Sequence, residues 1–491
     1  MKRKIVLLCI LSIFLLPLCL FACKPSEEEN LPNYQLNLSY DEETHVLNGS
    51  EEITFFNFYN NMFENLYFHL YPNAFREGAA NQVVDSTKID EAYPNGLSYG
   101  NIEVQSVTSD GKALVYVIEG EDENILNVSL PCQLYPDEEI TITIDFKVSL
   151  ANINHRLGYG ENTINFGNFY PVLAVYEEGN GFMTEPYHSN GDPFYSECAN
   201  YNVEIEYANS FSLAHSGSLI SSSQSGERIT AKIKGDKIRD FAFVLSDKFK
   251  KISSRVNGVT VNYFGYGDDT DLEERLQTSV DALSSFNDMF GDYPYSELNI
   301  VKSNFVHGGM EYPQLVLISD DVAGDDVNYV IVHEIAHQWW YSVVGNDEYN
   351  HAWMDEGLTE YSTFLFFEQN SQYGLDYDDM IEGTLNSYKL FERVYKNITG
   401  SVDGSMDRPL DKFNTEPEYV QCVYNKSVLM FDTLRDMVGE KKLLKAFKDY
   451  YQEYAFKNAS VQMLIASFID STHYNLEGFF NSWLQGNVEI I

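Results

Sequence analysis

Two histidines one helical turn apart are the first feature of this 491-residue sequence that could do chemistry. They are His333 and His337, and Glu334 follows the first of them in the segment VHEIAHQWW. If the segment is helical, both imidazoles point the same way and can bind one Zn²⁺, while Glu334 reaches a water molecule on the metal. The alternative is a buried helix whose histidines are satisfied by ordinary hydrogen bonds. A third ligand would decide between the two.

Glu356 is the candidate for that third ligand. It lies in HAWMDEGLTEY, a second segment with a helical pattern, and Gly345 with the polar stretch NDEYNH allows a turn between the two segments. Ligation by His333, His337 and Glu356 leaves zinc one open position, which is typical of a catalytic site. Glu360, one turn further on, can hydrogen-bond a ligating histidine, and the alternative is a solvated surface carboxylate. The sequence therefore predicts one Zn²⁺ per chain.

The elements that must position these residues are predicted from hydrophobic periodicity. Residues 34–248 contain segments that alternate apolar and polar side chains, most clearly EEITITIDFKVSL, separated by turn-forming stretches such as SSSQSGE. From residue 249 the pattern changes. DLEERLQTSVDALSSFNDMFG has helical periodicity, ELNIVKS and QLVLIS are predicted short strands on either side of VHGGMEYP, and the chain is almost wholly helical from Asp325 onward. The histidine helix is expected to begin at Asp325 or Asp326 and to end just before Gly345.

These patterns predict an α+β fold with two domains. An N-terminal antiparallel β domain spans residues 34–248, and a mostly α-helical domain spans residues 249–491. The first stretch, MKRKIVLLCILSIFLLPLCLFAC, has basic residues, an apolar run and then Cys23. It predicts a signal peptide at 1–22, a lipid on Cys23 and a tether at 23–33. An uncleaved anchor is the alternative, and both place the body outside the cytoplasm.

Composition narrows the class of protein. Hydrophobic residues make up 44% of the sequence, which indicates a globular protein. The formal charge is -42, which argues against nucleic acid as a partner because so few cations are available to neutralise phosphates. Beyond Cys23, the cysteines Cys132, Cys198 and Cys422 remain, and three thiols imply no disulfide framework. A Cys132–Cys198 bridge is possible, but buried free thiols are favoured.

The motifs together resemble the M1 aminopeptidase family of gluzincin metallopeptidases. HEIAH followed by Glu356 in WMDEGLTEY is similar to the family's zinc-binding pattern. HGGMEYP resembles its Gly-Ala-Met-Glu-Asn exopeptidase motif, and VYNKS resembles its Tyr-x-Lys-Gly segment. The opening YQLNLSYDEETHVLNGSEEITFFN looks like the first strands of the family's N-terminal domain. The resemblance thus covers nearly all of the chain after the predicted signal peptide.

The resemblance implies a thermolysin-like catalytic domain and a role for each motif. Glu334 would be the general base, and the hydroxyl of Tyr424 would stabilise the oxyanion. Glu311 would bind the substrate's α-ammonium, which makes the enzyme an exopeptidase. The implied substrate-binding residues are Gly308, Gly309, Met310 and Glu311. A second amine-binding group, which the family usually takes from the β domain, is not assigned.

Three positions depart from the family pattern. Gly309 replaces alanine, Tyr312 replaces asparagine and Ser427 replaces glycine. None of these changes removes a group that does chemistry, but Tyr312 is expected to reshape the first substrate pocket. The segment NLEGFFNSWLQGNVEII resembles the last helix of the family's catalytic domain, beyond which larger members carry a helical domain. The short form is therefore expected to have an open site that accepts longer peptides.

The resulting prediction is a zinc-dependent aminopeptidase that is anchored by lipid to the outer face of a bacterial cell membrane. Its substrates are predicted to be peptides with a free N-terminus. Two alternatives remain. One is a zinc endopeptidase with the same metal site, and the other is a peptide-binding lipoprotein without catalytic activity.

Overall fold

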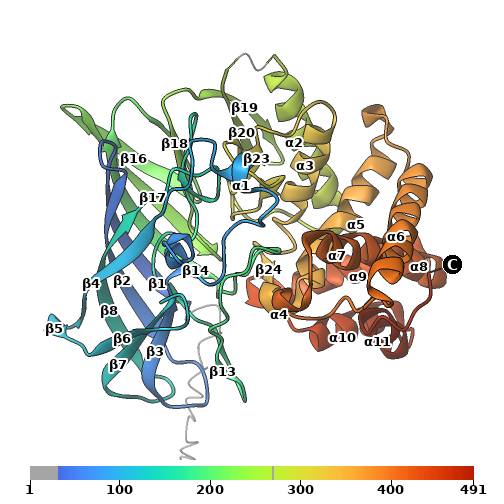
Figure 1. The fold of residues 1–491 in the computed structure, drawn as a ribbon, viewed down its shortest axis with the longest axis horizontal. Coiled ribbons are helices and arrows are strands. Elements are labelled where there is room, and N and C mark those ends of the chain that lie inside the picture. Colours follow the sequence, from blue (N-terminus) through green and yellow to red (C-terminus); the bar gives the residue numbers. More distant parts are fainter. Residues whose placement is uncertain (1–30, 268–269, 491) are drawn as a thin grey trace, which may run out of the picture.

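The computed structural model describes residues 31–267 and 270–490, and in it a β-rich half lies beside a helical half (Figure 1). The predicted signal peptide and the predicted lipidation site at Cys23 lie outside the described residues. In the described ranges, no helix combines the length and the apolar character needed to cross a membrane.

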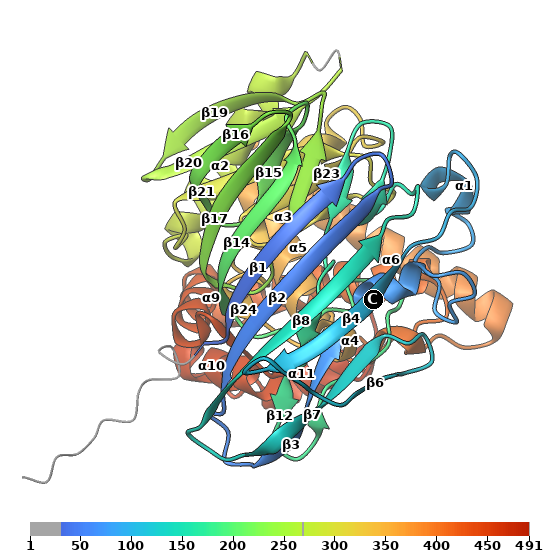
Figure 2. The ribbon, with the colours of Figure 1, turned by 90° about the vertical axis from the view of Figure 1, so that its left-hand side faces the viewer.

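An eight-stranded twisted sheet forms the outer layer of the β half (Figure 2). Its strands in spatial order are β16 (Ser218–Ser225), β17 (Arg228–Ile238), β14 (Ala199–Ala208), β1 (Asn33–Asp41), β2 (Val46–Phe56), β8 (Glu139–Ser149), β4 (Asn101–Ser109) and β5 (Lys112–Ala113). Neighbouring strands are antiparallel except for the parallel pair β1 and β14. Alternation along β8 buries Ile142, Ile144 and Phe146 on one face, so the period-two pattern fixes which face covers the core.

Smaller sheets complete the β half. One contains β15 (Ser212–His215), β18 (Phe243–Ser246), β10 (Ile164–Phe166) and β9 (Leu157–Tyr159), and another contains β11 (Val172–Leu173), β3 (Phe63–His69), β7 (Ile125–Leu134) and β6 (Tyr116–Glu119). β12 (Tyr176–Glu177) pairs with β13 (Gly181–Phe182), and the short helix α1 (Ile89–Ala92) follows a long loop. The loops of these small sheets matter below, because several reach the helical half.

A five-stranded mixed sheet joins the two halves. Its order is β19 (Lys250–Val256), β20 (Val259–Gly265), β21 (Glu297–Ser303), β23 (Leu315–Ser319) and β22 (Gly309–Met310). The two predicted short strands are thus confirmed as β21 and β23. Along β23, Val316 and Ile318 pack into the helical core, whereas Leu315 and Leu317 pack into the β core. Because side chains alternate, one sheet serves both cores, and its edge strand β22 lies at the joint.

Helices make up most of the chain beyond residue 325, as predicted. They are α3 (Asp326–Ala336), α4 (Glu348–His351), α5 (Trp353–Gln369), α6 (Tyr377–Thr399), α7 (Glu416–Val420), α8 (Lys426–Val438), α9 (Glu440–Tyr454), α10 (Val461–Thr472) and α11 (Glu477–Leu484), and the earlier helix α2 (Leu272–Phe290) packs with them. α5 confirms the second predicted helix around Glu356, and α2 ends just before Gly291.

The histidine helix is shorter than predicted. α3 ends at Ala336, and Gly345 lies in the two-residue strand β24 (Val344–Gly345), which pairs with β25 (Lys457–Asn458). A Cβ on Gly345 would lie 2.1 Å from the guanidinium carbon of Arg239. Gly345 is therefore required for the close approach of the buried Arg239 and does not end a helix. Asp325 occupies the N-cap position, but its side chain makes no capping hydrogen bond.

The cysteines of the described residues are free thiols, as favoured from the sequence. Cys132 is exposed, whereas Cys198 and Cys422 are buried. The Cys132–Cys198 bridge is therefore absent from the part of the chain that the structure describes.

Candidate metal centre and its cavity

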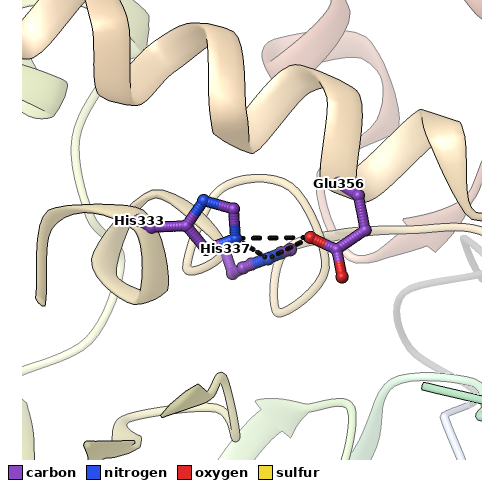
Figure 3. Close-up of side chains that lie close together, drawn as sticks. All are labelled: His333, His337 and Glu356. Atoms are coloured by element: carbon purple, nitrogen blue, oxygen red, sulfur yellow. Dashed lines mark hydrogen bonds and ion pairs between the residues drawn. The ribbon is translucent and has the colours of Figure 1, made fainter. Parts of the chain in front are cut away.

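The structure brings His333, His337 and Glu356 together from two helices (Figure 3). His333 lies in the last turn of α3, His337 is the residue that caps this helix, and Glu356 lies in the first turn of α5. The Nε2 atoms of the two histidines are 3.3 Å apart. Glu356 Oε2 lies 3.3 Å from Nε2 of His333 and 3.2 Å from Nε2 of His337. The three atoms form a nearly equilateral triangle.

This triangle fits a zinc ion. Ligand atoms about 2.0–2.1 Å from a tetrahedral zinc lie about 3.3 Å from one another, which matches the three printed separations. Two histidines and one carboxylate also form the donor set of a catalytic zinc site. The chain thus offers three ligands and leaves one tetrahedral position for water or substrate.

Hydrogen bonds on the far side of each imidazole fix its orientation. His333 Nδ1 lies 2.8 Å from Glu360 Oε2, so Glu360 is a partner of the metal site and not a solvated carboxylate. His337 Nδ1 lies 3.1 Å from the carbonyl oxygen of Trp340 and 3.1 Å from Oγ1 of Thr359. When Nδ1 of each ring donates to these acceptors, Nε2 keeps its lone pair for the metal.

The charge of the cluster favours a bound cation. Burial lowers the pKa of His337, but the carboxylates of Glu311 and Glu356 outweigh it and raise the pKa to about 10. Burial would raise the pKa of Glu356, but its contacts with His337 and His333 hold that pKa well below its usual range. A pair of buried histidines driven towards the charged form indicates a site that attracts positive charge.

Glu334, the residue of α3 that directly follows His333, lines the same cavity. Burial raises the pKa of its carboxyl to about 7, although the two histidines oppose this rise. A Cβ on Gly309 would lie 2.3 Å from Glu334 Oε1. The absence of a side chain at Gly309 therefore lets the carboxylate of Glu334 lie against the backbone of β22.

Tyr424 reaches the triad from a π-helix that spans Gln421–Asn425. Its hydroxyl donates a short hydrogen bond to Glu356 Oε1, and its ring stacks on that of His333 with centroids 5.9 Å apart. A π-helical turn is closed by a hydrogen bond one residue longer than that of an α-helix, and such turns are frequent at functional sites. Here it lies directly before α8 and holds Tyr424 beside the triad.

The predicted substrate-binding segment is split between two environments. Gly308, Gly309 and Glu311 line the cavity, whereas Met310 is fully buried and its sulfur accepts a hydrogen bond from Arg156. Glu311 is 3% exposed, and its Oε1 has no hydrogen-bond partner among residues 31–267 and 270–490. Burial raises the pKa of Glu311 well above its usual range. A ligand that donates to this oxygen would satisfy it.

The cavity has a volume of about 310 Å³, and one of its walls comes from β-half loops that carry no motif. The residues that the sequence analysis did not assign there are Lys88, Arg156, Ser189, Gly191 and Asp192. Arg156 is buried and donates a short hydrogen bond to Asp192 Oδ1. Asp192 is close enough for its charge to raise the pKa of Glu311, after the larger effect of burial. Asp192 is thus a candidate for the amine-binding group that the sequence left unassigned.

A family model matches most of the helical half. Residues 274–483 match the model of the peptidase family M1 domain. Human endoplasmic reticulum aminopeptidase 2 is 28% identical over 261 residues, which cover 49% of this chain and 26% of that protein. Human aminopeptidase B is 27% identical over 208 residues, which cover 39% of this chain and 30% of that protein. The chain therefore spans less than a third of the length of these curated relatives.

A solved structure matches nearly the whole chain. The M1 zinc metallopeptidase from Deinococcus radiodurans superposes with a TM-score of 0.67 at 16% identity, over 94% of this chain and 95% of that chain. At this identity the likeness shows the fold. The predicted two-domain α+β architecture, with a β domain before a mostly helical one, is thereby confirmed.

Proposed function

We propose that the chain is a zinc-dependent aminopeptidase that removes N-terminal residues from peptides, and the match of residues 274–483 to the peptidase family M1 domain supports this proposal. One observation carries the proposal. A single cavity contains the triad of His333, His337 and Glu356 and, beside it, the unpartnered carboxylate of Glu311. The triad suits hydrolysis of a carbonyl compound, and the carboxylate suits a free α-ammonium.

Glu334 is the group that moves protons. When bound, zinc supplies a Lewis acid that polarises the substrate carbonyl and makes water more acidic. Glu334 lines the cavity beside His333 and, being buried, has a pKa near neutrality. Its carboxylate can take a proton from water at one oxygen and deliver it to the nitrogen of the leaving amine.

Tyr424 supplies a hydrogen bond to the carbonyl oxygen as charge develops there. Its hydroxyl already points at the triad, where it donates to Glu356. Burial raises the pKa of Tyr424 well above its usual value, so the hydroxyl keeps its proton and remains a donor. Loss of such a donor typically lowers kcat by about 10²–10³-fold, and this is the loss we expect for Tyr424→Phe.

Glu311 and Asp192 define the point of cleavage in this proposal. Both line the cavity, one from the catalytic half and one from a β-half loop. Arg156 holds Oδ1 of Asp192 and leaves its second oxygen for another donor. If the two carboxylates hold the α-ammonium, the N-terminus of the substrate has a fixed position. Only the first peptide bond then reaches the triad.

Attachment to the outer face of a bacterial membrane is part of the proposal. What supports it is the sequence up to Cys23, which has a basic start, an apolar run and a lipobox-like end. Metabolic labelling with an alkyne fatty acid, followed by fractionation of Cys23→Ala, tests this anchor. We expect the wild-type protein to be labelled and found with membranes, and the variant to be unlabelled.

The catalytic proposal is tested with a panel of fluorogenic aminoacyl amides and the same compounds acetylated at the N-terminus. We expect cleavage of the free amides alone, loss of activity with a chelator and no activity in Glu334→Gln. Equal cleavage of acetylated compounds would favour the zinc endopeptidase. Stoichiometric zinc without any cleavage would favour the peptide-binding lipoprotein.

A further inference from the structure

Tyr312, the departure that follows Glu311, does not face substrate. The sequence predicts that Tyr312 reshapes the first substrate pocket, but within the described chain Tyr312 is fully buried and is not one of the residues that line the cavity. Its hydroxyl donates to Asn168 Oδ1 over 2.7 Å. A Cβ on Gly167 would lie 1.8 Å from this hydroxyl, so the phenol occupies space that Gly167 leaves open. Tyr312 therefore anchors the motif to the β half.

The anchor itself is held by further buried hydrogen bonds. Asn168 Nδ2 donates to Asp240 Oδ2 over 2.7 Å, which orients its carbonyl oxygen towards Tyr312. Asp240 Oδ1 accepts a hydrogen bond from the hydroxyl of Tyr170 at 2.8 Å and another from the backbone N–H of Phe241 at 2.7 Å. A network whose members are all satisfied resists displacement, because breaking any bond leaves a buried polar group unpaired.

Gln338 holds the same segment from the opposite side. It directly follows the zinc ligand His337 and is fully buried. Its Nε2 donates to the carbonyl oxygens of Glu311 and Tyr312, at 3.3 and 3.2 Å. Its Oε1 accepts a hydrogen bond from the backbone N–H of Gln314 at 2.8 Å. The backbone on either side of Glu311 is thus tied to the residue next to the metal site.

We propose that Tyr312 and Gln338 are positioning residues that hold Glu311 at a fixed place relative to the zinc triad, and that they thereby set the point of cleavage. This inference rests on the proposed aminopeptidase function. The carboxylate oxygen Oε1 of Glu311 makes no hydrogen bond within the described residues, so the side chain depends on its backbone for its position. Gln338 is also outside the set of described residues that line the cavity, so neither positioning residue contacts substrate.

Tyr312→Phe and Tyr170→Phe form a matched pair. Each variant removes one hydroxyl from the same buried network, but only Tyr312 adjoins Glu311. The probes are L-leucine and 4-methylpentanoate, which differ only in the α-ammonium, and binding to the zinc-loaded protein is measured by calorimetry. We expect Tyr312→Phe to lower the preference for L-leucine about ten-fold or more, since a displacement of 1 Å can cost 10²-fold. Tyr170→Phe should keep the preference within about two-fold, because Asp240 Oδ1 still accepts the backbone N–H of Phe241 and Asn168 still accepts the hydroxyl of Tyr312.

Gln338→Met tests the second positioning residue. It also keeps the proposal testable if Tyr312→Phe does not fold. We expect the same loss of preference for L-leucine with zinc still bound in a one-to-one ratio. An unchanged preference in either variant, or an equal loss in Tyr170→Phe, would overturn the proposal, as would a wild-type protein that does not distinguish the two probes. Binding needs no turnover. A wild type that prefers L-leucine but cleaves no peptide would therefore refute the aminopeptidase proposal alone.

Discussion

The chain up to residue 307 and the chain beyond it place histidine in opposite electrostatic environments. Up to residue 307, each described histidine whose pKa is shifted has it lowered by burial, and these are His45, His69, His155, His188, His215 and His307. Beyond that residue the shifts reverse. There, burial still lowers the pKa, but carboxylates outweigh it and raise the pKa of His333, His337 and His351.

The comparison shows that the partners of a histidine, and not its burial, decide its role. His215 and His337 are both buried, but the nearest polar partner of His215 Nδ1 is the carbonyl oxygen of Ser216, at 3.0 Å. Such a ring stays neutral and serves packing. His337 lies among the carboxylates of Glu311 and Glu356, whose negative charge must be balanced by a cation. The metal site is thus the place where buried carboxylates outnumber the protein cations that could balance their charge.

The largest effect is expected from replacing the histidine that lies among carboxylates. His337→Ala removes a ligand, so zinc content should fall and kcat/KM on a leucyl amide should drop by at least about 10³-fold. His215→Gln, a substitution of another buried ring in the β half, should leave kcat/KM within about two-fold. Zinc is measured by atomic absorption. Retention of a full zinc equivalent by His337→Ala would show that the triad is not the metal site.

A smaller effect is expected from the carboxylate behind the ligand. Glu360→Gln keeps the shape of the partner of His333 Nδ1 but removes its charge. Partners of this kind typically contribute 10–100-fold in metal affinity, and we expect a loss in that range. Competition with a chelator of known affinity measures it. An unchanged zinc affinity would mean that burial, and not the carboxylate, prepares His333 for the metal.

The sequence predicts those parts of the site whose residues lie close together in the chain. His333, His337 and Glu356 lie on two helices close in sequence, so spacing alone indicates which side chains converge. Asp192 and Arg156 come from β-half loops, and strand pairing between distant segments brings them to the cavity. No periodicity marks such loops.

Two features of the helical half show the same limit. α3 was expected to continue to Gly345 because glycine often ends a helix, but that glycine is required by the close approach of Arg239 from the β half. Tyr424 was assigned from a resemblance, and its π-helical turn has no signal in the sequence. Local chemistry is therefore predictable, whereas contacts between the halves depend on the completed fold.

Acid should destabilise the β half through its neutral histidines. Burial lowers the pKa of His69 to about 4, below its ordinary value of 6.5. Because the folded pKa is below the unfolded one, the unfolded chain binds more protons, and the stability present above pH 6.5 is lost as pH falls towards 4. At pH 5 this amounts to about 2 kcal/mol for one histidine. The free energy of unfolding is measured in urea at pH 7.5 and 5.0. Between these pH values, His69→Gln should lose less stability than the wild type by this amount. An equal loss in both proteins would show that His69 is not the group responsible.

The smallest effect concerns an ion pair that is only partly buried. Lys88 from the β half and Glu416 from α7 both line the cavity, and their Nζ and Oε1 atoms are 2.8 Å apart. Their side chains are 27% and 30% exposed, so solvent screens the pair, and such pairs contribute about 0.2–1 kcal/mol. The pair joins the halves on the solvent side of the cavity, where a longer peptide would have to displace it.

Lys88→Ala and Glu416→Ala should therefore lower KM for pentapeptides by no more than about five-fold and leave aminoacyl amides unchanged. The exchanged variant Lys88→Glu with Glu416→Lys should restore the wild-type KM, and 0.5 M salt should remove the differences because it screens exposed charges. A change above about ten-fold in one single variant only would mean that this side chain binds the peptide itself. In that case, a partly exposed charge in this cavity would contribute as much to peptide binding as the buried carboxylates around the zinc triad.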